Sequence, residues 1–333
     1  MNQQTTQFVV LAGMLGSGKT TLLEALLVDD EAAATTAVIV NEVGAINIDG
    51  AVLSESARGA PMATLSNGCV CCSLTNDLVT TIEDLVETRA NTAQPAFERI
   101  VLECSGLSRP GEVIRSLNPL SAMGLRIHVV VTYDCSRSPL DSDDFDNVAA
   151  QLGAAHTIVL TKTDLVTAQQ RQLGREKLER LNPLARIVDD SAIAIRAREA
   201  FRYTPDAKSF DWSVPESQGS APRALLHPRV RVFCARFRAA PEWEQTLDWI
   251  EDISGAIGER LLRMKAIVAG PAEGERVLLQ SVGTTFAQPR RLSASNTSTN
   301  QDMAAIFIAR DCGMADFEAF AMNGSIRWTS LQS

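Results

Sequence analysis

The sequence predicts an α/β protein in which a doubly wound domain with a mostly parallel sheet precedes a smaller α+β domain. Three observations lead to this fold class. Short β-branched runs alternate with helix-like stretches between Phe8 and Leu181, a proline-rich segment follows, and further strand-like runs then surround one amphipathic helix. Strands separated by helices favour a parallel sheet covered on both faces, whereas grouped strands favour an α+β arrangement.

The expected strands of the first domain are near-continuous apolar runs, which is typical of strands buried on both faces. They lie at 8–12, 36–40, 99–103, 127–132 and 157–161, with helices at 19–27, 75–91, 109–118, 145–152 and 168–181. In the second domain we expect strands at 229–237, 261–269, 276–282 and 304–309 and helices at 243–257 and 314–322. The predicted boundaries are therefore 1–204 for the first domain, 205–228 for a proline-rich linker and 229–333 for the second domain.

Composition excludes several classes of protein. Forty acidic and 31 basic side chains give a net charge of −9, which argues against binding nucleic acid or an anionic membrane surface through net charge. No apolar stretch approaches the roughly 18 to 20 residues of a membrane span, and the first residues do not resemble a signal peptide. We therefore expect a cytoplasmic protein, in which seven cysteines do not form a disulfide framework.

The strongest motif directly follows the first expected strand. Residues 13–20 have the sequence Gly-Met-Leu-Gly-Ser-Gly-Lys-Thr and precede a helical pattern, the context in which this motif binds phosphate. The glycines aim successive backbone N–H groups at phosphate oxygens, and Lys19 supplies a cation to the β and γ phosphates. The Thr20 hydroxyl is the expected ligand for Mg²⁺. This segment predicts a nucleotide-binding P-loop domain.

Two later strands end in polar residues that suit the same nucleotide. In Thr161-Lys162-Thr163-Asp164, the two carboxylate acceptors of Asp164 fit the adjacent N–H and NH₂ donors of guanine, which favours GTP over ATP. Thr161 stands where asparagine is usual in such a motif, and a solvated loop is the alternative explanation.

Glu103 is expected to hold Mg²⁺, usually through water, while Gly106 leaves room for the γ-phosphate. A capping or surface glutamate is the alternative for Glu103.

The cluster Gly68-Cys69-Val70-Cys71-Cys72 indicates a transition-metal site. Thiolates are soft ligands that select Zn²⁺, Cu⁺ or Co²⁺ over Mg²⁺ or Ca²⁺. The sequence lacks a second cysteine pair at structural-zinc spacing, so an open site for transient carriage is favoured. The alternatives are a structural zinc completed by a distant residue, a redox-active thiol pair, and buried cysteines that only fill space.

Between Pro222 and Arg238 the chain has arginines and no acidic residue. One explanation is a docking surface for an acidic client protein. The other is an edge strand that positive charge protects from pairing with other chains. The arginines concerned are Arg223, Arg229, Arg231, Arg236 and Arg238.

Taken together, the P-loop, Asn41-Glu42-Val43-Gly44, the thiol motif, Glu103-Cys104-Ser105-Gly106 and residues 161–164 resemble the CobW-type family of GTP-dependent metallochaperones, which also contains activators of nitrile hydratase. Leu261-Leu262-Arg263-Met264-Lys265 is similar to the leucine-arginine-x-lysine strand of that family's carboxy-terminal domain, so the resemblance covers nearly the whole chain. Val43 and Ala45 depart from the family, which often has phenylalanine and glutamate at these positions.

The resemblance implies a slow GTP hydrolase that uses Mg²⁺, carries Zn²⁺ or Co²⁺ on the three cysteines and delivers it to a client metalloenzyme. Glu42 would position water or complete the metal site, with an exposed loop carboxylate as the alternative. The catalytic candidates are Lys19, Glu42 and Glu103; the nucleotide-binding candidates are Gly13, Gly16, Ser17, Gly18, Lys19, Thr20, Thr21, Gly106, Thr161, Lys162 and Asp164; the metal-binding candidates are Cys69, Cys71 and Cys72 for the transition metal and Thr20 and Glu103 for Mg²⁺.

Two other functions are compatible with these motifs. One is a P-loop kinase or ATPase whose cysteines hold a structural zinc. The other is a metal or redox sensor that has lost hydrolysis. The motifs leave open which metal is carried, which client receives it and whether the chain forms a homodimer.

Overall fold

The structure is a computed structural model that describes residues 5–41, 60–65, 74–92, 94–137, 145–203, 229–292 and 303–331. The chain forms two compact units. The first consists of Met1–Gln151, Ala155–Gln172 and Ala185–Thr204, and the second of the remaining residues. Because residues 204–228 lie outside the described ranges, the proposed linker and the exact domain boundaries stay a prediction.

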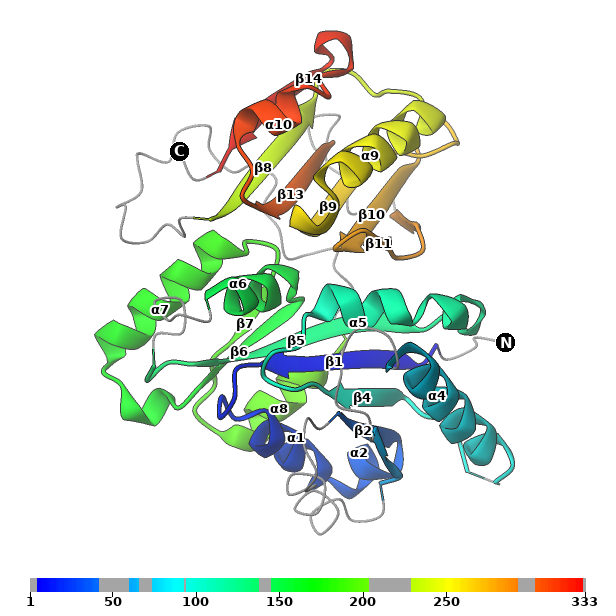
Figure 1. Cartoon of the computed structure of the whole chain (residues 1–333), viewed down its shortest axis with the longest axis vertical. Coiled ribbons are helices and arrows are strands. Elements are labelled where there is room, and N and C mark those ends of the chain that lie inside the picture. Colours follow the sequence, from blue (N-terminus) through cyan, green and yellow to red (C-terminus); the bar gives the residue numbers. More distant parts are fainter. Residues whose placement is uncertain are drawn as a thin grey trace. The chain divides into compact units, whose positions relative to one another are not determined.

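The first unit is built on a seven-stranded sheet in which every described pair of strands is parallel. Its strand order is β3-β2-β4-β1-β5-β6-β7. The predicted doubly wound α/β fold is thereby confirmed (Figure 1). The strands are β1 (Gln7–Gly13), β2 (Thr36–Asn41), β3 (Met62–Leu65), β4 (Arg99–Glu103), β5 (Arg126–Asp134), β6 (Thr157–Thr161) and β7 (Arg186–Val188).

Helices cover both faces of this sheet, which explains why β1, β2 and β6 are buried along their whole length. Figure 1 shows α1, α2 and α8 on one face and α5 and α6 on the other. Val9 and Leu11 of β1 pack with Leu22, Leu23 and Phe201 on the first of these faces. The helices are α1 (Lys19–Leu27), α2 (Asp30–Ala34), α4 (Leu74–Ala90), α5 (Pro110–Ser116), α6 (Phe145–Ala154), α7 (Ala168–Leu181) and α8 (Ile193–Phe201).

The central strand β1 lies between β4 and β5, and the direction of winding changes there. From β1 the chain passes to β2 on one side of the sheet, and from β4 it crosses to β5 on the other. Such a switch point leaves a crevice at the carboxyl ends of the strands, where ligands of open α/β sheets bind. The P-loop, Glu103 and residues 161–164 all follow strands at this edge.

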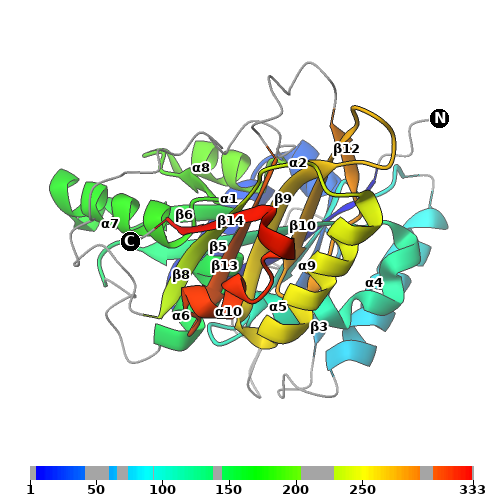
Figure 2. The ribbon, with the colours of Figure 1, turned by 90° about the horizontal axis from the view of Figure 1, so that it is seen from above.

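The second unit has a mostly antiparallel sheet with the order β11-β10-β9-β13-β8-β14, and β12 pairs with β10. This confirms the predicted α+β domain. Helices α9 (Trp243–Ile257) and α10 (Met314–Glu318) lie on the same side of this sheet (Figure 2). Its strands are β8 (Val230–Phe237), β9 (Leu261–Ala269), β10 (Arg276–Val282), β11 (Thr285–Phe286), β12 (Arg290–Leu292), β13 (Ala304–Arg310) and β14 (Ile326–Ser330).

The arginine-rich strand differs from the expectation of a charged sheet edge. Strand β8 pairs with β13 on one side and with β14 on the other, so it lies inside the sheet. Arg229, just before β8, forms an ion pair with Asp311 in which Nη2 and Oδ2 are 2.5 Å apart. Protection of a sheet edge therefore does not explain Arg231 and Arg236 of β8. Among the described helices, none has the length and apolar character needed to cross a membrane.

Candidate functional site

The loop after β1 turns tightly against β5. Gly13 has a φ of 140°, and a Cβ atom built on it would lie 2.2 Å from Thr132 Oγ1, so a larger residue would collide with β5. Ser17 Oγ and Thr132 Oγ1 are 2.6 Å apart and fill the space beside this glycine. Gly16 and Gly18 also have positive φ values, of 71° and 89°. The predicted P-loop thus forms a compact turn that ends where α1 begins.

The Lys19 side chain lies within this turn. It is 8% exposed, and its Nζ donates to the carbonyl oxygens of Gly13 and Met14 at 3.0 and 3.1 Å. Both acceptors belong to the loop, so the ammonium charge is held at the centre of the turn. This is the position from which a lysine contacts the β and γ phosphates of a nucleotide. Thr21, by contrast, is exposed on α1.

Thr20 and Glu103 come together from neighbouring elements. Leu11 of β1 pairs with Glu103 of β4, which places this carboxylate at the root of the P-loop. Thr20 Oγ1 donates to Glu103 Oε1 at 2.7 Å, and Glu103 is 5% exposed. A hydroxyl and a carboxylate oxygen are hard ligands of the kind Mg²⁺ prefers. Thr20 and Glu103 therefore fit the predicted role of holding a magnesium ion that accompanies a nucleoside triphosphate.

Gly106 lies against the P-loop from the β4 side. A Cβ atom at this position would lie 2.6 Å from the backbone nitrogen of Leu15. Real Cβ atoms do not approach backbone so closely, so any other residue would displace the P-loop or the loop after β4. The two loops are thus fitted to each other at the carboxyl edge of the sheet.

Thr161 connects the P-loop to the predicted base-binding loop. Its hydroxyl donates to the carbonyl oxygen of Ser17 at 2.8 Å and is 3.1 Å from the carbonyl oxygen of Tyr133. The residue is 5% exposed, and its Cγ2 would lie 3.6 Å from a Cβ at Gly18. In this conformation the hydroxyl holds backbone segments together. The predicted contact between Thr161 and a purine nitrogen stays untested.

Lys162 follows with a left-handed backbone, φ 52°, at the start of a short 3-10 helix, Thr163–Leu165. Its Nζ donates to Asp134 Oδ2 at 2.6 Å, and Asp164 is exposed beside it. Burial alone would raise the pKa of Asp134. The hydrogen bonds from Lys162 and from Ser136 outweigh this effect and hold the pKa below its ordinary value. The carboxylate therefore stays ionised next to the lysine.

Comparisons with known proteins agree with this arrangement. The family described as "CobW/HypB/UreG, nucleotide-binding domain" matches residues 7–189, more than half of the chain. The chain belongs to the CobW/HypB/UreG family. The second unit matches the family described as "Cobalamin synthesis protein cobW C-terminal domain" at residues 230–320.

Several relatives of this CobW/HypB/UreG chain have names that mention zinc. "Zinc chaperone YjiA" of Escherichia coli (strain K12) is 34% identical over 179 residues, which are 53% of this chain and 54% of that protein. "Zinc-regulated GTPase metalloprotein activator 1" of Schizosaccharomyces pombe is 27% identical over 63% of this chain and 53% of that protein. The chain thus spans about half the length of these two relatives. "Zinc chaperone CobW" of a Sinorhizobium species is 27% identical over 321 residues, which cover 86% of this chain and 88% of that protein.

The fold is also that of a solved structure. The crystal structure of Zn(II)-bound YjiA GTPase from E. coli superposes with a TM-score of 0.66 at 19% identity, and it covers 98% of this chain and 99% of the other. At this level of identity the likeness shows the shared fold. It supports the architecture of both units of this CobW/HypB/UreG protein.

The predicted transition-metal site lies outside the described residues, as do Glu42, Cys69, Cys71 and Cys72. Within the described ranges, no three histidine, cysteine or acidic residues form a group suited to a metal ion. The four described cysteines have no disulfide partner. Burial raises the pKa of each thiol: to about 12 for Cys104, to about 11 for Cys135 and Cys312, and in the same direction for Cys234. Protonated thiols are poor metal ligands.

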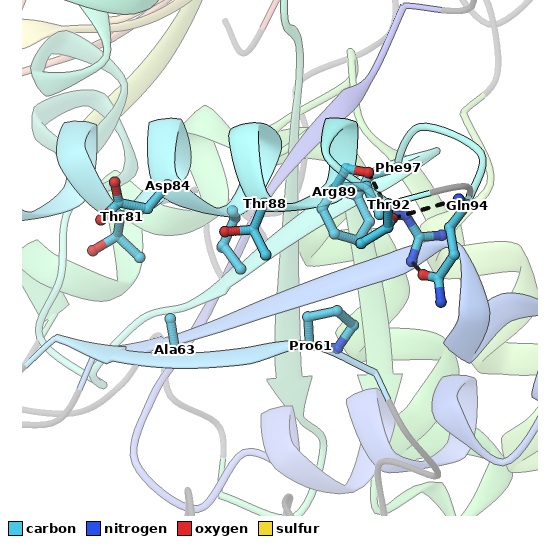
Figure 3. A pocket seen from close by; sticks show the side chains of 10 residues that line it. Pro61, Ala63, Thr81, Asp84, Thr88, Arg89, Thr92, Gln94 and Phe97 are labelled. Carbon is cyan, nitrogen blue, oxygen red and sulfur yellow. Dashed lines mark hydrogen bonds between the residues drawn. The ribbon is translucent and has the colours of Figure 1, made fainter.

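A cavity of about 330 Å³ lies between α4 and β3, away from the P-loop (Figure 3). Its walls include Ala63, Thr81, Thr88 and Phe97. Arg89 also lines it, with its guanidinium 4.6 Å from the centre of the Phe97 ring and hydrogen-bonded to the Pro95 and Ala34 carbonyl oxygens. None of the predicted site residues lines this cavity. It is therefore separate from the nucleotide site of this CobW/HypB/UreG chain.

Proposed function

We propose that this protein is a GTP hydrolase that carries a transition metal, Zn²⁺ or Co²⁺, and delivers it to a client metalloenzyme under control of the bound nucleotide. The family supports the GTP hydrolase. The names of the relatives, which mention zinc chaperones and a zinc-regulated GTPase, support the metal and its delivery. The cluster of three cysteines in this sequence supplies the thiolates that such a cargo requires.

One relationship carries this proposal: the strands that lead to Glu42 and to the cysteines end in register with the strand of Glu103. Val40 of β2 pairs with Glu103 of β4, and the next residue, Asn41, pairs with Leu65 of β3. The chain continues from Asn41 to Glu42, and from Leu65 towards Cys69. Both segments thus start at the edge of the sheet that holds Lys19 and Thr20. The proposal is that a nucleotide bound there controls both segments.

The described residues would divide the work on GTP. Lys19 would stabilise the negative charge on the transferring phosphoryl group. Thr20 and Glu103 would hold Mg²⁺, directly or through water, and the bound ion would neutralise charge on the β and γ oxygens. Asp164 and Lys162 would bind guanine, and Glu42 would position water or complete the metal site. We further propose the domain boundaries 1–204 and 229–333 and a cytoplasmic location. A homodimer stays a prediction.

A metal titration tests the proposal. The full chain is saturated either with GDP or with a non-hydrolysable GTP analogue, and Zn²⁺ or Co²⁺ is titrated into each sample. Nucleotide control predicts dissociation constants that differ by about tenfold or more, which is the size of an ordinary coupling between two sites. Changing Cys69, Cys71 and Cys72 to serine should abolish tight uptake, whereas the matched control Cys135→Ser should not. Equal constants in both nucleotide states contradict the proposal.

A further inference from the structure

We infer that Asp134 is a positioning residue for nucleotide recognition, because it holds the ammonium of Lys162, one of the two residues proposed to bind the base. The inference rests on the proposed function, in which Lys162 and Asp164 bind guanine. The sequence patterns did not point to Asp134, which lies at the carboxyl end of β5, outside every motif considered above. The contacts described next assign it this role.

The register of the sheet brings the two residues together. Asp134 is the last residue of β5 and pairs with Thr161 of β6, and Lys162 is the residue after Thr161. The amide of Cys135 donates to the Thr161 carbonyl at 3.2 Å and extends this pairing by one step. Backbone hydrogen bonds between the two strands thus hold the Cα atom of Lys162 beside Asp134. The left-handed backbone of Lys162, unusual for a residue with a Cβ, fixes the direction of its side chain further.

The two carboxylate oxygens of Asp134 accept hydrogen bonds from different residues. Oδ1 accepts hydrogen bonds from the backbone nitrogen and the hydroxyl of Ser136, at 2.9 and 2.6 Å. Oδ2 accepts from Lys162 Nζ at 2.6 Å. The Asp134 side chain is 3% exposed and that of Lys162 is 29% exposed. Ser136 therefore holds one oxygen of the buried carboxylate, and the other oxygen holds the ammonium of the partly exposed Lys162 side chain.

This arrangement lowers the cost of binding a nucleotide. A lysine side chain that moves freely in water loses conformational entropy when a ligand orders it, and this loss weakens binding. Lys162 is already ordered by Asp134, so less of this cost falls on the binding step. Arg137 differs, because its side chain is 65% exposed and its Nε lies 3.6 Å from Asp134 Oδ2. Its Nη1 would lie 3.7 Å from a Cβ built on Gly16, so this cation is close to the P-loop.

A double-mutant cycle tests the inference. Asp134→Asn keeps the shape of the side chain but removes its charge, and it should weaken binding of GTP and GDP by about tenfold to a hundredfold. Lys162→Met should weaken binding similarly. If Asp134 acts through Lys162, adding Asp134→Asn to Lys162→Met should weaken binding by less than about twofold more. Full additivity of the two losses overturns the inference.

Two further variants separate positioning from folding. Ser136→Ala leaves the charge of Asp134 in place but loosens its anchor, and it should weaken GTP binding severalfold only when Lys162 is present. Arg175→Gln, the matched control, breaks an exposed ion pair with Glu179 within α7 and should change binding by less than about twofold. Urea unfolding of each variant reports stability in parallel. If Asp134→Asn and Ser136→Ala lower stability but leave nucleotide affinity unchanged, Asp134 only bridges two strands and the inference is wrong.

The same experiments distinguish failure of the inference from failure of the proposed function. The preference for GTP over ATP is measured by competition for each variant. If Lys162→Met and Asp164→Asn both leave GTP affinity and this preference unchanged, the proposed guanine site is wrong. If they weaken GTP binding while Asp134→Asn does not, the guanine site stands and only the positioning role of Asp134 is contradicted.

Discussion

The Thr161 hydroxyl donates a hydrogen bond to the Ser17 carbonyl oxygen at 2.8 Å, and this contact joins the predicted base-binding loop to the P-loop. The two segments come from β6 and β1, which are not neighbours in the sheet because β5 lies between them. Ser17 and Thr161 are 1% and 5% exposed. The contact therefore crosses β5 in a region from which water is largely excluded.

Removing this hydroxyl should lower the stability of the protein and weaken nucleotide binding by the P-loop. Thr161→Val is nearly isosteric but leaves the buried Ser17 carbonyl without this donor, so we expect a loss of about 1–3 kcal/mol in the free energy of unfolding. GTP and ATP should both bind more weakly and to the same degree, as measured with fluorescent nucleotide analogues. Thr161→Ser keeps the donor and is the control. A change in the GTP-to-ATP preference would instead show that the hydroxyl contacts the base.

Gly106→Ala should impair nucleotide binding through a steric clash. The new methyl group would lie 2.6 Å from the Leu15 backbone nitrogen, so the P-loop or its neighbour must shift. We expect GTP affinity to fall by about tenfold or more, since one such collision costs about 1–3 kcal/mol. Gly255→Ala is the matched control. That glycine is exposed in α9 with no atom within 4 Å of a built Cβ, so stability should be unchanged or rise by about 0.5–1 kcal/mol.

Glu103→Gln should slow GTP hydrolysis and weaken the response to magnesium. The amide oxygen still accepts the hydrogen bond from Thr20, but the negative charge that would hold Mg²⁺ is lost. We expect turnover to fall by about tenfold to a hundredfold, a loss of about 1.4–2.7 kcal/mol in transition-state stabilisation, and half-maximal activity to need more Mg²⁺. The exposed Glu112, paired with Arg109, supplies the control Glu112→Gln. A variant with normal turnover at every Mg²⁺ concentration would exclude Glu103 from the magnesium site.

The long buried strands were predictable because their apolar runs are continuous. The bounds of β4, β6, α1, α7, α9, β9 and β10 agree with those expected. The short strands β3 and β7, of four and three residues, were missed because so few residues carry no periodic signal. Strand β14 was missed because its sequence, Ile-Arg-Trp-Thr-Ser, is mostly polar and only its first residue is buried. Its pairing with β8 explains why β8 was wrongly expected at the sheet edge. Helix α5 ends early because Pro119 disfavours a helix before it.

The candidate site was predictable where chemistry depends on a local motif. Residues 13–20 predict the P-loop because the glycines and Lys19 lie within one segment of eight residues. The role of Glu103 was predicted from its place at the end of a strand. Asp134 was not predictable in the same way. An acidic residue after an apolar strand has many uses, and only the pairing of β5 with β6 brings it to Lys162. The signal that would have found it is an acid at the end of the strand that directly precedes the base-binding strand.

Thiol labelling should separate the seven cysteines into two classes. Because burial raises the pKa of Cys104 to about 12 and of Cys135 and Cys312 to about 11, less than about one in a thousand of these groups is thiolate at pH 7.5. Cys234 shifts in the same direction. A folded-state pKa above the ordinary value favours the neutral thiol, so this contribution to stability is present below the ordinary pKa and is lost as the pH rises through the folded value.

We therefore expect a disulfide reagent at pH 7.5, in the absence of metal, to modify three thiols rapidly and four slowly. Urea should make all seven reactive, and raising the pH towards 11 should accelerate the slow class. The triple change of Cys69, Cys71 and Cys72 to serine should remove the fast class, and stoichiometric Zn²⁺ should protect it in the wild-type chain. Protection that requires the GTP analogue would link thiolate ligation to the nucleotide, whereas a fast class that survives the triple change would place the reactive thiols elsewhere.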